Sequence, residues 1–480
     1  AVGSLLFAPT VDRLLATPGV SGTINRVGLV DHLSRRWTQP QATYYAAVRR
    51  VPPGHRLRVQ RGSRQVTRYW HMLPPGKTVR WVRADELDAY EGLLAQAVAR
   101  CLPDGAAGVW LSGGVDSVSV AMLAAEQRHR EGARPLDALG LRFPDPGEDE
   151  SAVQEAVAAE LGMPLELVPL GTTATAGGIL VAALQMSAGW PAPVASPLDP
   201  AYRYLAAVAA RRGCSTVLTG VGGDEVLGAG PVYAAELIRT GNMAGLQRLW
   251  RSLRATYGLP HRALALRLLW QEGGRVLLRD AVQRWAPGLY ATRRAAAAAL
   301  PAWLAPDRQL RQTVIAGRLD PARRGSPYQR AIAAELDDPQ TGMGLEFFFE
   351  LGRRAGLQLR HPFWDPDLVR FLYRTPPELL NHGDAPKGLA RDLLARRMPA
   401  LALGTRRKVT PGRFFARVLR QEGAAAWRGL GGTPALAALG IVDTDRLQRT
   451  VTPVLAGQAA VGYLQLWDIL SLEAWLQPRM

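Results

Sequence analysis

A six-residue loop at positions 112–117, SGGVDS, constrains the fold of this chain more than any other feature. The apolar run before it, at 108–111, is typical of a buried strand, and residues 117–130 have the amphipathic pattern of a helix. The loop therefore lies at the amino end of a helix, where free N–H groups and the helix dipole favour an anion. Its spacing is neither that of the Walker loop GxxxxGK[ST] nor that of the GxGxxG dinucleotide turn, so we expect a phosphate loop of another kind.

A second glycine-rich loop, TGVGGDE at positions 219–225, also follows an apolar run that predicts a strand. Parallel strands end at a common edge of their sheet, and ligands of open α/β folds bind at this edge. We therefore expect Asp116 and Asp224 to lie near each other. Two such carboxylates could bind Mg²⁺, a hard cation that uses one or two carboxylates together with phosphate oxygens.

The alternation of strand and helix patterns predicts an α/β fold with a parallel sheet. Strands are expected at 108–111, 137–143, 165–170 and 215–219, and helices at 87–101, 117–130, 150–161, 178–187 and 201–212. Beyond about residue 230 the pattern predicts helices only. Near the amino end, short β segments at 4–7, 44–51, 56–59 and 65–70 predict a small β-rich domain at 1–78, followed by a larger domain at 79–480.

Three motifs together resemble a known family. SGGVDS resembles the pyrophosphate-binding loop (PP-loop) of ATP pyrophosphatases. The order of SGGVDS, TGVGGDE and RHPFWD (360–365) along the chain resembles the order of three motifs in the asparagine synthetase family. Residues 43–55 and 68–70 also resemble the end of that family's glutaminase domain. The resemblance implies an adenine nucleotide alpha-hydrolase-like parallel sheet with a large helical C-terminal part, preceded by a truncated, glutaminase-like (Ntn-type) domain without a catalytic cysteine.

The same resemblance implies ATP and Mg²⁺ as cofactors, with cleavage of ATP between its α and β phosphates. The residues that match the family's ATP and pyrophosphate contacts are Leu111, Ser112, Gly113, Gly114, Asp116, Ser117, Leu141, Thr219, Gly220 and Lys387. Asp116 and Asp224, the expected metal ligands, are also expected to act in catalysis. Lys408 matches the family lysine that stabilises negative charge in the acyl-transfer transition state. For Lys387 a solvated position at a helix start is the alternative.

The chain departs from the glutamine-dependent members of the family. Residue 1 is Ala, and neither Cys101 nor Cys214 lies near it, so we expect the attacking amine to belong to the substrate itself. Family members of that kind include β-lactam synthetase, carbapenam synthetase and the lasso peptide cyclases. At the position of Val221, asparagine synthetases have Glu and β-lactam synthetase has Tyr. At the position of Gln358, both kinds of enzyme have Glu. Neither Val nor Gln can act as a general base.

These departures favour a lasso peptide cyclase. Such an enzyme adenylates an Asp or Glu side chain of a precursor peptide, releases pyrophosphate, and lets the peptide's N-terminal amine displace AMP to close a macrolactam. Its expected partners are the precursor peptide, a leader-binding protein and a leader peptidase. The alternative is a small-molecule amide synthetase similar to β-lactam synthetase or asparagine synthetase.

Three residues are candidates for contact with the substrate, namely Val221, Gln358 and Arg360. The guanidinium of Arg360 could bind a phosphate or a substrate carboxylate. It could equally form a structural ion pair with Asp365 or Asp367.

Charge leaves a further class open. The formal net charge is +17, and residues 251–330 hold 15 arginines against 4 acidic residues, with aromatic side chains between them. Some PP-loop enzymes modify tRNA, and such a surface could bind RNA, but the whole-chain resemblance to amide synthetases disfavours nucleic acid as a partner. No apolar run approaches the roughly 20 residues of a membrane-spanning helix, and the two cysteines form no disulfide or metal pattern. We therefore expect a cytoplasmic protein without a membrane partner.

Overall fold

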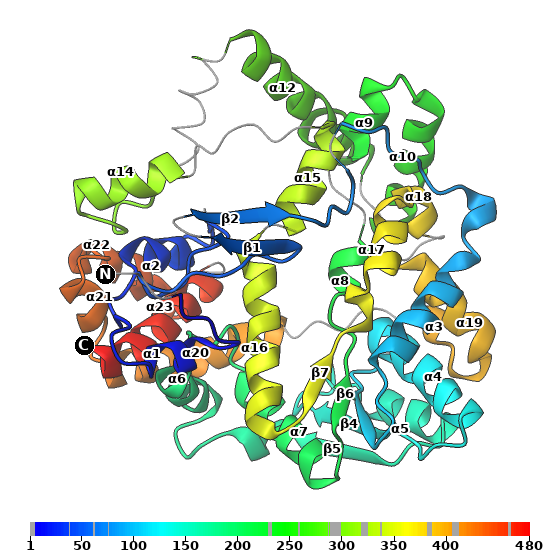
Figure 1. Ribbon diagram of the computed structural model, residues 1–480, viewed down its shortest axis with the longest axis horizontal. Coiled ribbons are helices and arrows are strands. Elements are labelled where there is room, and N and C mark those ends of the chain that lie inside the picture. The colour runs from blue at the N-terminus through cyan, green and yellow to red at the C-terminus, as the bar shows by residue number, and fades with distance from the viewer. Residues whose placement is uncertain are drawn as a thin grey trace.

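The computed structural model describes residues 5–37, 39–60, 63–74, 76–228, 233–257, 260–286, 288, 299–317, 325–336, 338–381, 386–405, 412–458 and 462–480. It contains a five-stranded parallel sheet with the order β5-β4-β3-β6-β7, which lies in the lower half of the view in Figure 1. The strands are β3 (Ala107–Trp110), β4 (Asp137–Arg142), β5 (Leu165–Pro169), β6 (Thr216–Leu218) and β7 (Gln358–Arg360). The four predicted strands are confirmed to within one residue at their ends. The expectation of helices only beyond residue 230 is wrong, because β7 pairs with β6.

The sheet is buried on both faces because its strands alternate their side chains between two hydrophobic clusters. In β3, Val109 faces one cluster and Trp110 faces the other, and Leu218 and Val217 of β6 divide in the same way. The cluster around Val109 includes side chains from α3 (Ala89–Cys101), α4 (Val115–Arg130), α5 (Ser151–Glu160), α17 (Pro366–Tyr373) and α19 (Gly388–Arg397). The cluster around Trp110 includes side chains from α6 (Ile179–Gly189), α7 (Asp199–Arg211), α16 (Pro339–Ala355), α20 (Gly412–Gly429) and α23 (Tyr463–Leu476). The α/β class predicted from the sequence is therefore confirmed.

Helices α3 to α7 are the five predicted helices, with ends that differ by at most two residues. The remaining helices are α8 (Gly223–Val226), α9 (Tyr233–Arg239), α10 (Met243–Tyr257), α11 (His261–Ala265), the π-helix η3 (Leu266–Gly274), α12 (Arg275–Trp285), α14 (Arg308–Gly317), α15 (Pro327–Leu336), α18 (Pro377–Leu380), α21 (Pro434–Ala438) and α22 (Thr444–Leu455). Short 3₁₀ helices are η1 (Ala84–Glu86), η2 (Leu170–Thr173), η4 (Pro362–Trp364), η5 (Pro399–Leu401), η6 (Leu403–Thr405) and η7 (Gln477–Arg479). Within the described part of the chain, no helix combines the length and the apolar character needed to cross a membrane.

The amino-terminal region contains less β structure than predicted. It holds the helices α1 (Val11–Leu15) and α2 (Arg26–Leu33) and one antiparallel hairpin of β1 (His55–Gln60) and β2 (Ser63–Arg68). The hairpin confirms the predicted segment 56–59 and residues 65–68 of the predicted segment 65–70, since residues 69 and 70 lie beyond the end of β2.

The other two predicted β segments of this region are wrong. Residues 5–7 have no regular structure, while residue 4 lies outside the described residues, and segment 44–51 forms turns with isolated bridges. The physical reason is visible in 44–51, where the buried apolar side chains are Tyr44, Tyr45 and Val48. This spacing lacks the period of two that a half-buried strand requires.

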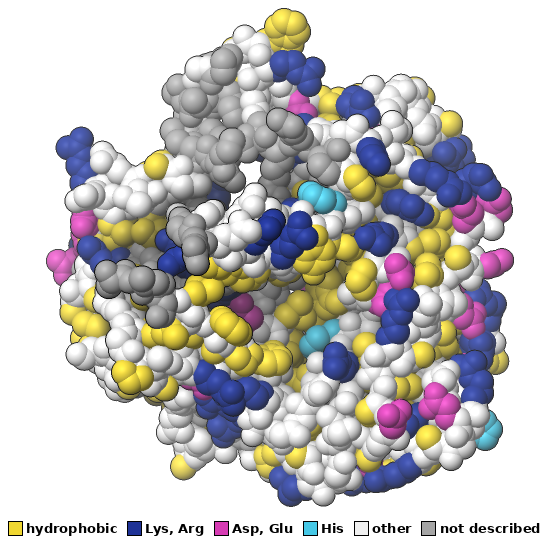
Figure 2. Space-filling model, in the orientation of Figure 1, with side chains coloured by type: hydrophobic (Ala, Val, Ile, Leu, Met, Phe, Trp, Pro, Cys, Tyr) yellow, Lys and Arg dark blue, Asp and Glu magenta, His cyan; other side chains and the backbone are white. Residues whose placement is uncertain are grey.

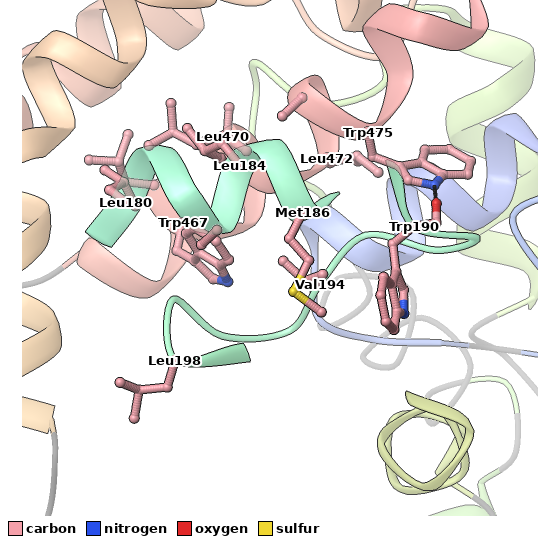
Figure 3. Close-up of a cluster of buried hydrophobic side chains, with 14 of the residues drawn as sticks. Leu180, Leu184, Met186, Trp190, Val194, Leu198, Trp467, Leu470, Leu472 and Trp475 are labelled. Atoms are coloured by element: carbon pink, nitrogen blue, oxygen red, sulfur yellow. Dashed lines mark hydrogen bonds between the residues drawn. The ribbon is translucent and has the colours of Figure 1, made fainter. Parts of the chain in front are cut away.

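The amino-terminal region shares a hydrophobic core with the carboxyl-terminal helix, and both chain ends lie on the same side of the molecule (Figure 1). The rings of Tyr44 and Tyr45 pack against Trp475 of α23, with centroids 5.3 and 5.6 Å apart. Trp475 also donates a hydrogen bond from Nε1 to the backbone oxygen of Trp190, which follows α6, at 3.1 Å (Figure 3). Burial of these aromatic rings stabilises the contact between segments that are far apart in sequence.

Candidate functional site

The loop at 112–117 follows β3 and opens α4, as predicted, with Gly114 at the helix N-cap. The hydroxyl oxygens of Ser112 and Ser117 lie 2.9 Å apart, and the backbone N–H of Ser112 donates to Oγ of Ser117 at 3.1 Å. Gly113 has a φ of +74°, a left-handed conformation that glycine adopts without strain. These contacts fix the loop against the first turn of the helix, where backbone N–H groups are available to an anion.

The loop after β6 packs directly against the loop after β3. A Cβ atom added at Gly220 would lie 2.7 Å from the backbone nitrogen of Ser117, and one at Gly223 would overlap the carboxyl group of Asp116. The two loops are adjacent because β3 and β6 are hydrogen-bonded neighbours. The two glycines let the loops approach each other closely, since a side chain at either position would collide with the other loop. The expectation that Asp116 and Asp224 share one edge of the sheet is therefore confirmed.

Lys387 joins the two loops. Its ammonium group forms an ion pair with Asp116 and lies 2.6 Å from Oδ1 of Asp224. The Lys387 side chain is only 9% exposed, and its backbone adopts a left-handed conformation, φ 64°, at the N-cap of α19. The alternative of a solvated lysine at a helix start is therefore wrong, because the side chain is buried and paired with two carboxylates.

A cavity of about 350 Å³ opens at this edge of the sheet, and its wall has two chemically distinct parts. The polar part includes the glycine-rich loop, Asp116, Asp224, Lys387 and Arg391. The apolar part includes Trp110, Leu111, Leu139, Leu141, Leu198, Tyr202 and Leu205. Tyr202 stacks on Trp110 with ring centroids 5.2 Å apart. A wall with one apolar side and one side rich in N–H groups and charges suits a base joined to phosphates.

The residues present fit Mg²⁺ and ATP. The carboxylates of Asp116 and Asp224 already converge on one cation, the Lys387 ammonium, so their oxygens are close enough to share an ion. Across the described residues no group of three or more His, Cys, Asp and Glu side chains is assembled for a metal. Two carboxylates completed by phosphate oxygens are the donor set that Mg²⁺ commonly uses. When bound, the ion would neutralise phosphate charge beside the glycine-rich loop.

Most of the predicted nucleotide contacts line this cavity: Leu111, Ser112, Gly113, Gly114, Asp116, Leu141 and Lys387. Ser117, Thr219 and Gly220 are not among its lining residues and instead hold the two loops in shape. Lys408 lies outside the described residues, so its expected role stays a prediction.

Thr219 is buried and holds the second loop through its hydroxyl group. Its Oγ1 accepts the N–H of Val221 at 3.2 Å and lies 2.7 Å from Nδ1 of His361. Burial, together with the positive charge of the neighbouring Arg360, lowers the pKa of His361 to about 4, so the ring is neutral at pH 7. His361 was not predicted as part of the site, and only its position directly after Arg360 could have suggested it.

The three predicted substrate residues do not line the cavity. Gln358 and Arg360 lie on the same exposed face of β7, where Nη2 of Arg360 donates to Oε1 of Gln358. The alternative in which Arg360 pairs with Asp365 or Asp367 is wrong, because both carboxylates bond to Arg100, at 2.8 and 3.0 Å.

The sequence interpretation missed several lining residues. Glu148 and Glu150 line the cavity, and Glu148 pairs with Arg417 at 2.9 Å. Arg391 lies four residues after Lys387, and this spacing could have placed it on the same helix face. Burial lowers the pKa of Arg391, while the carboxylate of Asp116 opposes that shift.

Comparison with known proteins agrees with this geometry. Residues 89–477 match the family model described as asparagine synthase, which is more than half of the chain. Among characterised relatives, the amidase chyE of Penicillium rubens is 29% identical over 220 residues, which cover 42% of this chain and 32% of the relative. Asparagine synthetase [glutamine-hydrolyzing] 3 of Bacillus subtilis is 26% identical over 147 residues, which cover 29% of this chain and 23% of the relative. The chain thus matches about a third or less of the length of these relatives, while the family model spans most of its own length. We conclude that the chain belongs to the asparagine synthase family.

Proposed function

We propose that this protein activates a substrate carboxylate with ATP and then joins it to an amine. One observation carries the proposal: Lys387 links Asp116 of the glycine-rich loop to Asp224 of the neighbouring loop at the mouth of a half-apolar cavity. Family membership supports ATP-dependent amide bond formation as the reaction class. In the first step a carboxylate oxygen of the substrate attacks the α phosphorus of ATP, and pyrophosphate leaves. In the second step the amine attacks the carbonyl carbon of the acyl-adenylate, AMP leaves, and the amine releases one proton.

The residues of this chain would divide the work by their chemistry. The N–H groups at the start of α4 and the side chains of Lys387 and Arg391 would bind the pyrophosphate as it leaves. Asp116 and Asp224 would hold Mg²⁺. Lys408 would stabilise the negative charge of the acyl-transfer step.

We further propose that the substrate is a precursor peptide and that the product is a lasso-type macrolactam. Gln358 is hydrogen-bonded by Arg360, and Val221 has no ionisable group, so neither position supplies the base expected of the small-molecule synthetases. Cys101 and Cys214 do not line the cavity at the glycine-rich loops. Burial and the nearby Asp137 raise the pKa of Cys214 to about 11, so this thiol is not a nucleophile at neutral pH. A leader-binding protein and a leader peptidase are proposed as partners on the resemblance alone.

The test is an incubation of the full chain with ATP, Mg²⁺ and a leader-free precursor peptide. We expect peptide-dependent release of pyrophosphate and AMP and a product lighter by one water. Release of ADP and phosphate would contradict the assignment of the loop. Pyrophosphate release with aspartate and ammonia, but with no peptide, would favour an asparagine synthetase-like enzyme. Steeply salt-dependent retention of tRNA without peptide-dependent pyrophosphate release would favour tRNA modification.

A further inference from the structure

A second and larger cavity, of about 1400 Å³, lies between the amino-terminal region and α16. Sites for small molecules usually measure about 300–1,000 Å³, so this space exceeds what a single amino acid or nucleotide needs. Hydrophobic side chains gather around a hollow in the middle of the face that Figure 2 shows, near the position of the hairpin in Figure 1. The cavity is separate from the nucleotide site, since the two sets of lining residues have no member in common.

One wall is formed by α16. Gln340, Met343, Gly344 and Phe347 line the cavity at spacings of three and four residues, which place them on one side of a helix. Gly344 is open to the cavity, because a Cβ atom added there would meet no heavy atom within 4 Å. Trp190 packs against Phe347, with ring centroids 6.0 Å apart, and continues the apolar wall.

The opposite wall is formed by the hairpin. Leu57 of β1 lies directly opposite Val66 of β2, and both side chains line the cavity and are 37% exposed. Arg64 lies on the same face, two residues before Val66. A two-stranded hairpin is marginally stable in isolation, so a ligand that covered this apolar face would stabilise it.

The charges of the wall leave a positive excess. The acidic side chains that line the cavity each form an ion pair: Asp468 with Arg35 at 2.5 Å, Glu346 with Arg50 at 2.5 Å, and Glu350 with Arg353 at 2.6 Å. Arg49 and Arg64 also line the cavity and are exposed. A ligand with apolar side chains and a carboxylate would therefore match both the surface and its charge.

Helix α16 connects this cavity to the nucleotide site. Phe347 faces the larger cavity, whereas its neighbour Phe348 packs against Trp110 and Tyr202, with ring centroids 6.1 and 6.3 Å apart. Trp110 and Tyr202 line the nucleotide cavity. A chain bound in the larger cavity would thus lie one aromatic layer away from the site where its carboxylate would be activated.

We propose that the larger cavity binds the peptide substrate, with apolar side chains between α16 and the hairpin and acidic groups near Arg49 and Arg64. The inference rests on the proposed function for the identity of the ligand, but it makes a separate claim about where the ligand binds. A peptide of several residues fills the volume, and the unfilled apolar face of the hairpin becomes covered when it binds.

The test compares Gly344→Trp with two matched controls in the full chain. Gly344→Trp fills the cavity from a helix position that has room, Gly344→Ala changes the same residue without filling it, and Gly92→Trp adds the same side chain to α3, where a Cβ atom also meets nothing within 4 Å. Thermal unfolding checks that each variant folds. The probe is a pool of short synthetic peptides, each with a free N-terminal amine, aromatic residues, one glutamate and a fluorescein at the carboxyl end, and its binding is followed by fluorescence anisotropy.

We expect Gly344→Trp to weaken peptide binding by at least about tenfold, while Gly92→Trp binds like the wild type and Gly344→Ala weakens binding less than Gly344→Trp does. Equal binding by Gly344→Trp, or no binding by the wild type, would overturn the inference. Pyrophosphate release in the presence of ATP and Mg²⁺ separates the two proposals. Peptide binding that Gly344→Trp abolishes, without pyrophosphate release by the wild type, would uphold the binding site and contradict the proposed function. Peptide-dependent pyrophosphate release by Gly344→Trp, with the wild-type KM for the peptide, would uphold the proposed function and contradict the binding site.

Discussion

The ammonium nitrogen of Lys387 lies 2.6 Å from Oδ1 of Asp224 and is also paired with Asp116. The two carboxylates follow different strands, and Lys387 precedes a helix much later in the chain. Two carboxylates at such close quarters would repel each other without a cation between them. The lysine therefore holds the two loops in position before any nucleotide arrives, and a metal ion bound there would take over part of its role.

Replacement of Lys387 by Met should lower the melting temperature and reduce pyrophosphate release by about 100-fold or more, because a positively charged group at the phosphates is lost. Mg²⁺ alone should raise the melting temperature of the variant more than that of the wild type, since in the variant the ion no longer competes with the Lys387 ammonium group for the two carboxylates. Differential scanning fluorimetry with and without Mg²⁺ measures this difference.

The matched control for that variant is Lys77→Met, because the Lys77 side chain is exposed and does not line the cavity. We expect it to behave like the wild type in both measurements. Wild-type pyrophosphate release by Lys387→Met would contradict the role given to this lysine.

Gly220→Ala should unfold more easily than the wild type by about 1–3 kcal/mol, because its new methyl group would press on the backbone nitrogen of Ser117, which cannot move independently of α4. Urea titration gives the free energy of unfolding. Gly171→Ala, which adds the same methyl group where nothing lies within 4 Å, is the control. Equal stability of the two variants would show that the two loops are not packed as closely as described.

Short-range patterns predicted much of the site. Residues 112–117 and 219–225 each lie between a strand and a helix, and parallel strands bring such loops to one edge by geometry alone. The pairing of Lys387 with both carboxylates was not predictable in this way, because no local pattern links residues more than 150 positions apart. Resemblance placed Lys387 near phosphate, and only the fold placed it between Asp116 and Asp224.

The failures have physical causes as well. Strand β7 spans only Gln358–Arg360, and a three-residue segment after a long helix has no periodicity to detect. The region 44–51 contains β-prone residues, but Tyr44 and Tyr45 pack on Trp475, so tertiary packing decides their conformation. The apolar wall formed by Leu198, Tyr202 and Leu205 follows one face of α7, and that face becomes part of the site only when the helix packs on the sheet.

Lys408→Ala should separate the second chemical step from nucleotide binding. The variant should keep the rise in melting temperature that ATP and Mg²⁺ cause, because binding to the native state stabilises it, yet form amide product at least about 100-fold more slowly. The comparison with Lys387→Met is informative, since in that variant ATP should add little to the rise in melting temperature that Mg²⁺ alone causes, and amide product should also form slowly. Product formation at the wild-type rate in Lys408→Ala would refute the expected role of this lysine.

His361→Asn should change how stability depends on pH, since the asparagine amide can still hydrogen-bond Thr219 but cannot titrate. The pKa of His361 falls from its ordinary 6.5 to about 4 in the folded chain. Between pH 6.5 and 4, His361 is therefore largely protonated in the unfolded chain and largely neutral in the folded chain. The wild type consequently loses stability as the pH falls from 6.5 towards 4. Between pH 7.5 and 5, the free energy of unfolding of the wild type should fall by about 2 kcal/mol more than that of His361→Asn.

Urea titrations at the two pH values measure this difference, and the control is His129→Asn, which changes an exposed histidine. Parallel pH profiles for the wild type and His361→Asn would mean that His361 is as accessible to protons in the folded chain as in the unfolded one.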